Sequence, residues 1–258
     1  MALEIVDSTS QGIQQLNSTP TMGYPVASGC NVQIFDSYSN NYNEMVNNVI
    51  RQTGYDADNF VSAKLHKLRS LFPSLSEKPF RLLDFGCGVG NLYGQVANFF
   101  PTVVYTGVDL SKDSILKARS RYPGDVDFQE HDSKEWEANG YDLIFSAGVF
   151  HHIPHVRHMG LINKLSSLLN QGGRLVIWEH NPLNPITQKL VKDCPIDEDV
   201  VLLYSKNLKN YFTQVSLSNI QVIYTTFFPK FLSALNFMDP YLGWLPLGGQ
   251  YLVTGQKD

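Results

Sequence analysis

One short segment constrains the fold of this chain more than any other, and it reads LLDFGCGVGNL over residues 82–92. An apolar run ends at Asp84, and glycines follow at every second position, at 86, 88 and 90, before a helical pattern begins. Glycine lets the backbone turn tightly and approach a ligand closely, because it carries no Cβ. A strand that enters a helix through such a loop is typical of an α/β sheet that binds a ligand at the carboxyl ends of its strands.

The surrounding pattern predicts strands that alternate with helices. Near-continuous apolar strands of this kind predict a parallel sheet that is covered on both faces, in a Rossmann-like three-layer α/β/α sandwich. Helices capped by Asp56 or Asp58, by Ser111 and by Ser205 are expected among the connections. The expected strands are 80–85, 103–110, 126–132, 141–150, 174–180, 219–228 and 250–257, and the expected helices are 34–50, 56–72, 91–100, 111–122, 156–169, 185–194 and 205–214.

The domain organisation follows from changes in texture. Residues 1–31 are polar without a sustained period and predict a flexible arm. Residues 32–258 then form one domain, with a helical cap at 32–78 and a Rossmann-like core at 79–258 that carries an insertion at 228–248. The insertion is rich in apolar and aromatic residues from 227 to 247. It is either a lid or membrane-surface patch, or a helical segment packed on the sheet, and roughly helical spacing slightly favours packing.

Composition excludes several classes of protein. The 258 residues are 43% hydrophobic and 17% charged with a formal net charge of −4, which fits a globular domain and not a general nucleic-acid binder. Three widely spaced cysteines, Cys30, Cys87 and Cys194, favour a reduced, cytoplasmic protein. No basic residue precedes Arg51, and no apolar run is long enough for a secretory signal or a bilayer span.

Acidic residues at successive strand ends indicate the ligand. Asp109 ends the second strand, 23 residues after Gly86, where a carboxylate can accept both hydroxyls of a ribose. Asp132 ends the third strand, where it can meet the exocyclic amine of adenine. A nicotinamide site has G-x-G-x-x-G, because its pyrophosphate lies on a helix N-terminus. The observed G-x-G-x-G, with Asp84 before it, suits a ligand with an ammonium group, such as S-adenosylmethionine. An NAD-dependent oxidoreductase is the alternative enzyme.

The motifs D-x-G-x-G-x-G, VDLS, HDS, YDLIFSAGVFHHIP and LLNQGGRLVIWEH together resemble the class I S-adenosylmethionine-dependent methyltransferases, over residues 79–180. The resemblance implies a seven-stranded sheet whose last strand is antiparallel. By position it also implies the residues that bind the cofactor. These are Asp84, Gly86, Cys87, Gly88 and Gly90 at the methionine end, Asp109 and Leu110 at the ribose, Asp132 and Ser133 at the adenine, and Ser146 and Ala147 past the fourth strand.

Two flanking segments extend the resemblance. FDSYSNNYN is similar to the entry helix of many small-molecule methyltransferases, which makes Tyr38 and Tyr42 candidates for closing over the cofactor, although Ser39 and Asn43 depart from the usual residues. EHNPLNPITQ, CPIDEDVVLL and WLPLGGQYLVTGQK resemble a bacterial subgroup often assigned to sugars, polysaccharide precursors or secondary metabolites. The implied function is methyl transfer to a small-molecule acceptor, by preference a hydroxyl group. A cofactor-binding regulatory protein without turnover is the alternative from another class.

Histidines supply the candidate for general base. His151 follows the fourth strand and is the first choice, and His180 follows the fifth strand and is the second, because imidazole titrates in a suitable range. The alternative is that these histidines bound the pocket without moving a proton. No metal site is expected: His155 and His158 have helical spacing, but no paired carboxylates accompany them, and both are expected on the surface.

Overall fold

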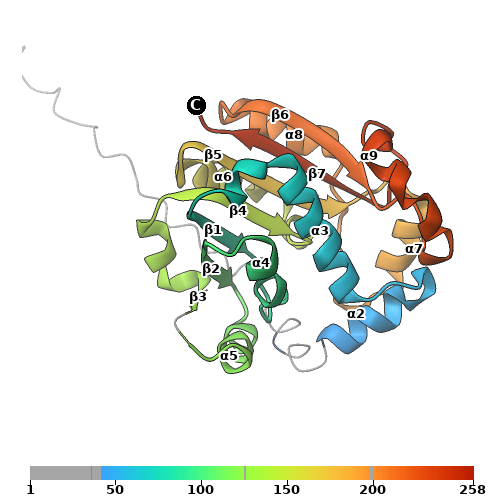
Figure 1. Cartoon of the computed structure of the whole chain (residues 1–258), viewed down its shortest axis with the longest axis horizontal. Coiled ribbons are helices and arrows are strands. Elements are labelled where there is room, and N and C mark those ends of the chain that lie inside the picture. The colour runs from blue at the N-terminus through green and yellow to red at the C-terminus, as the bar shows by residue number, and fades with distance from the viewer. Residues whose placement is uncertain (1–35, 37–41, 125, 198–199) are drawn as a thin grey trace, which may run out of the picture.

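The computed structural model describes residues 36, 42–124, 126–197 and 200–258, and these form one seven-stranded sheet (Figure 1). The strand order is β3-β2-β1-β4-β5-β7-β6, and β7 runs antiparallel to both of its neighbours while the other pairs are parallel. The predicted Rossmann-like architecture with an antiparallel last strand is therefore confirmed. The strands are β1 Phe80–Phe85, β2 Val103–Asp109, β3 Asp127–Glu130, β4 Tyr141–Ala147, β5 Leu169–His180, β6 Ser218–Thr225 and β7 Gln250–Gln256.

Helices cover both faces of the sheet. In Figure 1, α3 and α4 lie in front of it and α6 and α8 lie behind. The α-helices described are α2 Tyr42–Ile50, α3 Ala57–Leu71, α4 Tyr93–Phe99, α5 Lys112–Arg121, α6 His155–Ser167, α7 Pro185–Lys192, α8 Ser205–Gln214 and α9 Asp239–Leu242. Residues 1–35 and 37–41, which include the predicted arm, lie outside the described part of the chain.

Two hydrophobic cores lie on opposite faces of the sheet. Successive residues of a strand point to opposite faces, so Leu82 joins the core under α3, α4 and α5 while Leu83 joins the core under α6 and α8. Both side chains are at most 1% exposed. The continuous apolar texture of the parallel strands is thus explained by burial on both sides.

Side-chain caps set the starts of α3 and α5. The side chain of Asp56 accepts a hydrogen bond from the amide of Asn59, and the Asn59 side chain accepts one in return, which is a complete capping box for α3. Ser111 likewise accepts from the amide of Ser114 at 3.1 Å and caps α5. The predicted cap at Ser205 is wrong: Ser205 is the first residue of α8, and the N-cap position is held by Tyr204 without a side-chain bond.

The fifth strand begins earlier than expected. Residues 170–173 were expected to close the preceding helix, but β5 already begins at Leu169, which pairs with Tyr141 of β4. The amide of Gly172 donates to the carbonyl of Lys257 at 2.8 Å, and the amide of Lys257 donates to Gly173. These long-range hydrogen bonds to the end of the chain extend the sheet through Gly172 and Gly173. Local sequence spacing alone predicts the end of a helix there.

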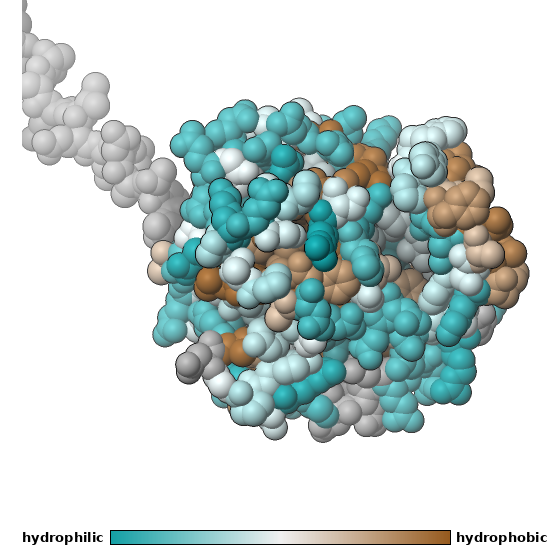
Figure 2. All heavy atoms as spheres, in the orientation of Figure 1, coloured by the Kyte–Doolittle hydropathy of each residue, from teal (hydrophilic) through white to brown (hydrophobic). Residues whose placement is uncertain are grey.

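The insertion between β6 and β7 contains a 3-10 helix, η7 (Lys230–Met238), followed by α9. Packing differs along the insertion: η7 is exposed throughout, and Phe231, Tyr241 and Trp244 are each more than 70% exposed. Leu242 and Leu245 are partly buried, and the carbonyl of Gly243 accepts the amide of Tyr224 on β6 at 2.8 Å, so the end of the insertion lies against the sheet. Figure 2 shows an apolar patch at the right edge of the molecule, where Figure 1 places α9. Among the helices described, none is both long and apolar enough to cross a membrane.

Candidate functional site

The glycine loop after β1 is anchored to the next strand. The amides of Gly86 and Cys87 both donate to the carbonyl of Val108, at 2.7 and 3.0 Å. Gly86 and Gly88 have positive φ angles of 82° and 52°, a region that favours glycine. A Cβ on Gly86 would lie 2.2 Å from the Val149 side chain, whereas a Cβ on Gly88 would meet nothing within 4 Å. Gly86 is therefore required by packing, and Gly88 faces open space that a ligand can fill.

Replacing Gly88 with alanine tests this distinction. The open surroundings leave only the left-handed backbone strain, about 1–2 kcal/mol of stability, but the methyl group would occupy the space that faces the ligand. We expect cofactor affinity to fall at least about tenfold, measured by calorimetric titration with S-adenosylmethionine. Gly172→Ala is the matched control, because its φ is 77° and its nearest neighbour, Gln256, lies 3.9 Å away. Equal affinities in the two variants would contradict the assignment.

Asp109 stands at the end of β2 and touches the glycine loop. Its Oδ2 accepts the amide of Gly88 at 2.8 Å, and its Oδ1 accepts the amide of Ser111 at 2.8 Å. Burial raises the pKa of this carboxyl, and the backbone donors partly offset that effect. Each oxygen keeps a further lone pair, so the carboxylate can accept the two hydroxyls of a ribose while it holds the loop in place.

Asp84 is buried beside this loop, at the end of β1. It is 4% exposed, and its Oδ2 accepts a hydrogen bond of 2.7 Å from the hydroxyl of Tyr105. Burial raises its pKa to about 7, against the effect of the Tyr105 hydrogen bond, while Asp109 raises it further and Lys64 lowers it. A cation such as the ammonium group of methionine stabilises the ionised form of a buried carboxylate of this kind.

The remaining predicted cofactor residues lie along the same edge of the sheet, with different exposures. Leu110 and Ala147 are half-buried, and Asp132 and Ser133 are exposed in a 3-10 turn after β3. Ser146 is fully buried, and its Oγ has no hydrogen-bond partner among the residues described.

Cys87 and the two tyrosines complete the predicted cofactor set. Cys87 is 7% exposed within the core under α3, and its thiol donates to the carbonyl of Gly88 at 3.6 Å. Burial also raises the pKa of its thiol well above the ordinary value. Tyr38 lies outside the described residues, and of Tyr42 only the backbone, at the start of α2, is described. From the same entry segment, Asp36 accepts a 2.6 Å hydrogen bond from the Ser111 hydroxyl, beside the cofactor edge.

A second group of polar residues lies at the ends of β4 and β5. His151 belongs to the 3-10 helix η5 (Phe150–His152), and its Nδ1 lies 2.6 Å from Oε2 of Glu179 on β5. The other oxygen of Glu179 accepts the amides of Val149 and Phe150, at 3.1 and 2.7 Å. One carboxylate, 1% exposed, therefore holds both the loop after β4 and the orientation of the His151 ring.

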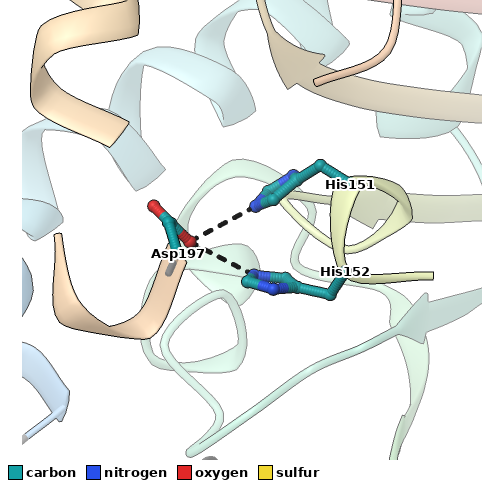
Figure 3. A group of neighbouring side chains, drawn as sticks. All are labelled: His151, His152 and Asp197. Carbon is teal, nitrogen blue, oxygen red and sulfur yellow. Dashed lines mark ion pairs between the residues drawn. The ribbon is translucent and has the colours of Figure 1, made fainter. Parts of the chain in front are cut away.

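Asp197 approaches the same histidine from the other side. It lies in the 3-10 helix η6 (Pro195–Asp197), and its Oδ1 is 3.5 Å from Nε2 of His151 and 3.3 Å from Nε2 of His152, as Figure 3 shows. The ring of His180, at the end of β5, is centred 5.1 Å from the ring of His151. Three histidines and two carboxylates thus meet at one edge of the sheet, next to the glycine loop.

The three histidines of this group have different pKa values. Burial alone would lower the pKa of His151, but Glu179 and Asp197 on its two nitrogens raise it to about 10. Burial, and then the charge of His151, lower the pKa of His180 to about 4. Burial also lowers the pKa of His152, although Asp197 opposes the effect. At neutral pH His151 is therefore protonated and has no lone pair for a substrate proton, while His180 is neutral.

Sequence reasoning missed Glu179 and Asp197 as members of this group. Glu179 directly precedes His180 at the strand end, and Asp197 lies in the segment CPIDEDVVLL. No local sequence pattern shows that either residue contacts His151. The expected exposure of His158 is wrong. It is fully buried, and its Nε2 lies 2.9 Å from the carbonyl oxygen of Phe150 and 2.8 Å from that of Ile153, so that it packs structurally beneath the loop.

Comparisons with known proteins show what the chain is similar to. A family model described as a methyltransferase domain matches residues 83–175. A trans-aconitate 2-methyltransferase from Rhodopseudomonas palustris (strain BisA53) is 32% identical over 124 residues, which cover 47% of this chain and 47% of that protein. One from Escherichia coli (strain K12 / DH10B) is 37% identical over 95 residues, 36% of each chain. The chain thus aligns with about half the length, or less, of these curated relatives.

Solved structures share the fold over most of the chain. A methyltransferase from Thermotoga maritima, described as a possible histamine N-methyltransferase, superposes with a TM-score of 0.61 at 15% identity, covering 88% of this chain and 99% of that one. The plantazolicin methyltransferase, solved with S-adenosylhomocysteine, gives 0.59 at 15% identity, covering 88% and 95%. Sheet order, antiparallel β7 and the glycine loop define a Rossmann-like methyltransferase fold. Residues 83–175 thus match a methyltransferase domain, within a fold that the chain shares with class I S-adenosylmethionine-dependent methyltransferases.

Proposed function

We propose that this protein transfers a methyl group from S-adenosylmethionine to an oxygen of a small-molecule acceptor, by preference a hydroxyl of a sugar or other metabolite. The observation that carries the proposal is the adjacency of two groups at one sheet edge. The loop and acids of β1 and β2 suit the cofactor, and the histidines and carboxylates of β4 and β5 suit an acceptor whose proton must be removed. Methyl transfer to a hydroxyl needs both.

The chain's own residues account for cofactor selection. Asp84 supplies a buried negative charge for the ammonium group, Asp109 accepts from the ribose, and Gly88 leaves the backbone open to close approach. When bound, S-adenosylmethionine supplies a methyl carbon on a positively charged sulfur, and the new carbon–oxygen bond forms as the carbon–sulfur bond breaks. A dinucleotide pyrophosphate beside Asp84 would instead meet like charge, which argues against the NAD-dependent alternative.

The geometry favours His180 over His151 as general base. Both nitrogens of His151 face carboxylates, whereas neither ring nitrogen of His180 has a hydrogen bond within the described residues. Removal of a general base costs about 10²–10⁴-fold in rate. We expect His180→Gln to lower kcat about 100-fold while the Kd for S-adenosylmethionine changes less than threefold. An unchanged kcat would remove His180 from the reaction, and His66→Gln, on the exposed side of α3, is the control.

The test of the function begins with the cofactor. Calorimetric titration of the full chain should show micromolar binding of S-adenosylmethionine and S-adenosylhomocysteine, and none of NAD. Incubation with S-adenosylmethionine and a panel of sugars, hydroxylated metabolites and carboxylic acids should then release S-adenosylhomocysteine, with the methylated product identified by mass spectrometry. Binding of NAD alone would overturn the proposal. Tight cofactor binding without turnover on any acceptor would favour the regulatory alternative.

A further inference from the structure

We propose that His151, His152 and Asp197 form a binding site for one divalent transition-metal ion. The three side chains come from two segments that are 45 positions apart, and they converge on one point at the acceptor side of the sheet edge (Figure 3). Their potential ligand atoms all lie within 4.8 Å of one another. Two imidazoles and one carboxylate are a set that binds Zn²⁺ and related ions with positions left for a substrate.

The two printed separations match those between neighbouring ligands of an ion. Oδ1 of Asp197 lies 3.5 Å from Nε2 of His151 and 3.3 Å from Nε2 of His152. An N–H···O hydrogen bond has its usual length at about 2.9–3.0 Å. Around an ion with bonds of about 2.0–2.1 Å, two ligand atoms lie about 2.9 Å apart at a right angle and about 3.4 Å apart in a tetrahedron. The observed separations are those of neighbouring ligands in a tetrahedral site.

Glu179 completes the arrangement behind the first ligand. A histidine that binds a metal through one nitrogen almost always donates the other N–H to a carboxylate or carbonyl, which fixes the ring and its tautomer. The Nδ1 of His151 makes that bond to Glu179 at 2.6 Å, with both side chains 1% exposed, and this leaves Nε2 directed at Asp197. Binding of an ion through Nε2 displaces the proton that this nitrogen carries in the metal-free protein. Glu179 is itself held by two backbone amides. The side chain of Asp197 is 12% exposed and that of His152 is 13%, so one side of the group remains accessible.

The role of the ion in catalysis rests on the proposed function. An ion at this point can bind the acceptor oxygen and lower the pKa of its hydroxyl, as bound metals do for water. His180 would then accept the hydroxyl proton, and the oxygen would bond to the methyl carbon as the carbon–sulfur bond breaks. No change of oxidation state is involved, so Zn²⁺ is a suitable probe.

The experiment is a calorimetric titration of the chelator-treated full chain with ZnCl₂, without cofactor or acceptor. We expect one Zn²⁺ per chain with a Kd below about 1 μM, and a rise in the midpoint of thermal unfolding. His152→Ala and Asp197→Asn should each weaken binding at least about 100-fold, since even second-shell changes cost about 10–100-fold. His155→Ala is the matched control, because that histidine is exposed in the next helix and outside the group.

The outcomes are separable from those of the proposed function. Equal Zn²⁺ affinity in the wild type, His152→Ala and Asp197→Asn would overturn the inference, as would a wild type that binds no Zn²⁺. Binding of S-adenosylmethionine by each variant shows that it is folded. Zinc binding that depends on the three residues, in a protein that transfers no methyl group, would leave the metal site standing and reject only the function.

Discussion

Replacing Glu179 with alanine should destabilise the fold by about 3–5 kcal/mol, the usual cost of removing one partner of a buried charged pair. The substitution strands the charge of His151 and leaves the amides of Val149 and Phe150 without their acceptor. For a chain of this size the unfolding midpoint should fall by about 6–20 °C. Thermal unfolding followed by circular dichroism measures it.

Glu137→Ala is the control for this substitution. Glu137 also pairs with a cation, Lys164, but both side chains are substantially exposed, at 25% and 42%. An exposed pair contributes about 1 kcal/mol or less, so its loss should shift the midpoint by no more than about 4 °C. Similar shifts in the two variants would show that Glu179 does not hold the loop after β4.

Replacing Asp109 with alanine should lower the affinity for S-adenosylmethionine by about 10²- to 10⁴-fold. Two hydrogen bonds from hydroxyls to a carboxylate contribute about 1.5–3 kcal/mol each, and about 1.4 kcal/mol corresponds to tenfold in affinity. The variant also removes the acceptor of the Gly88 amide, so the loop loses one of its anchors. Calorimetric titration of wild type and variant measures the difference.

Asp127→Ala is the matched control for Asp109. Asp127 begins β3, three register positions before the strand end at which Asp109 lies, and it accepts from Thr106 and Gln129. Its loss should alter stability but leave cofactor affinity within about threefold of the wild type. A wild-type Kd in Asp109→Ala would place the ribose elsewhere and remove the central support for the cofactor assignment.

Sequence patterns predicted the fold well wherever the signal was local. The expected first strand, 80–85, has the observed bounds, because its apolar run and the glycines after it are both short-range features. The positions of the glycine loop and Asp109 at one sheet edge were also predicted, because β1 and β2 are consecutive strands that pair directly. The cap at Ser205 failed because several neighbouring residues can start a helix, and backbone geometry chooses among them.

The acceptor side was harder to predict because its contacts are long-range. Asp197 lies near His151 because the chain after α7 returns to the ends of β4 and β5. No sequence spacing predicts that return. His158 was expected on the surface because no carboxylate set accompanies it, but its Nε2 lies within 2.9 Å of two carbonyl oxygens beneath the loop. Helical spacing in 227–247 does not show which part of that segment has a partner surface: η7 is exposed, whereas Leu242 and Leu245 are partly buried.

The divided origin of the site has an evolutionary consequence. The cofactor residues come from β1 and β2, whereas Asp197 comes from a segment after α7 that contributes no strand to the sheet. Selection can therefore alter the 193–197 segment, and with it the acceptor, while the inherited cofactor half remains intact. The alignment to the family model, which ends at residue 175, is consistent with such divergence. Grafting this segment between homologues is accordingly a rational route to new acceptor specificity.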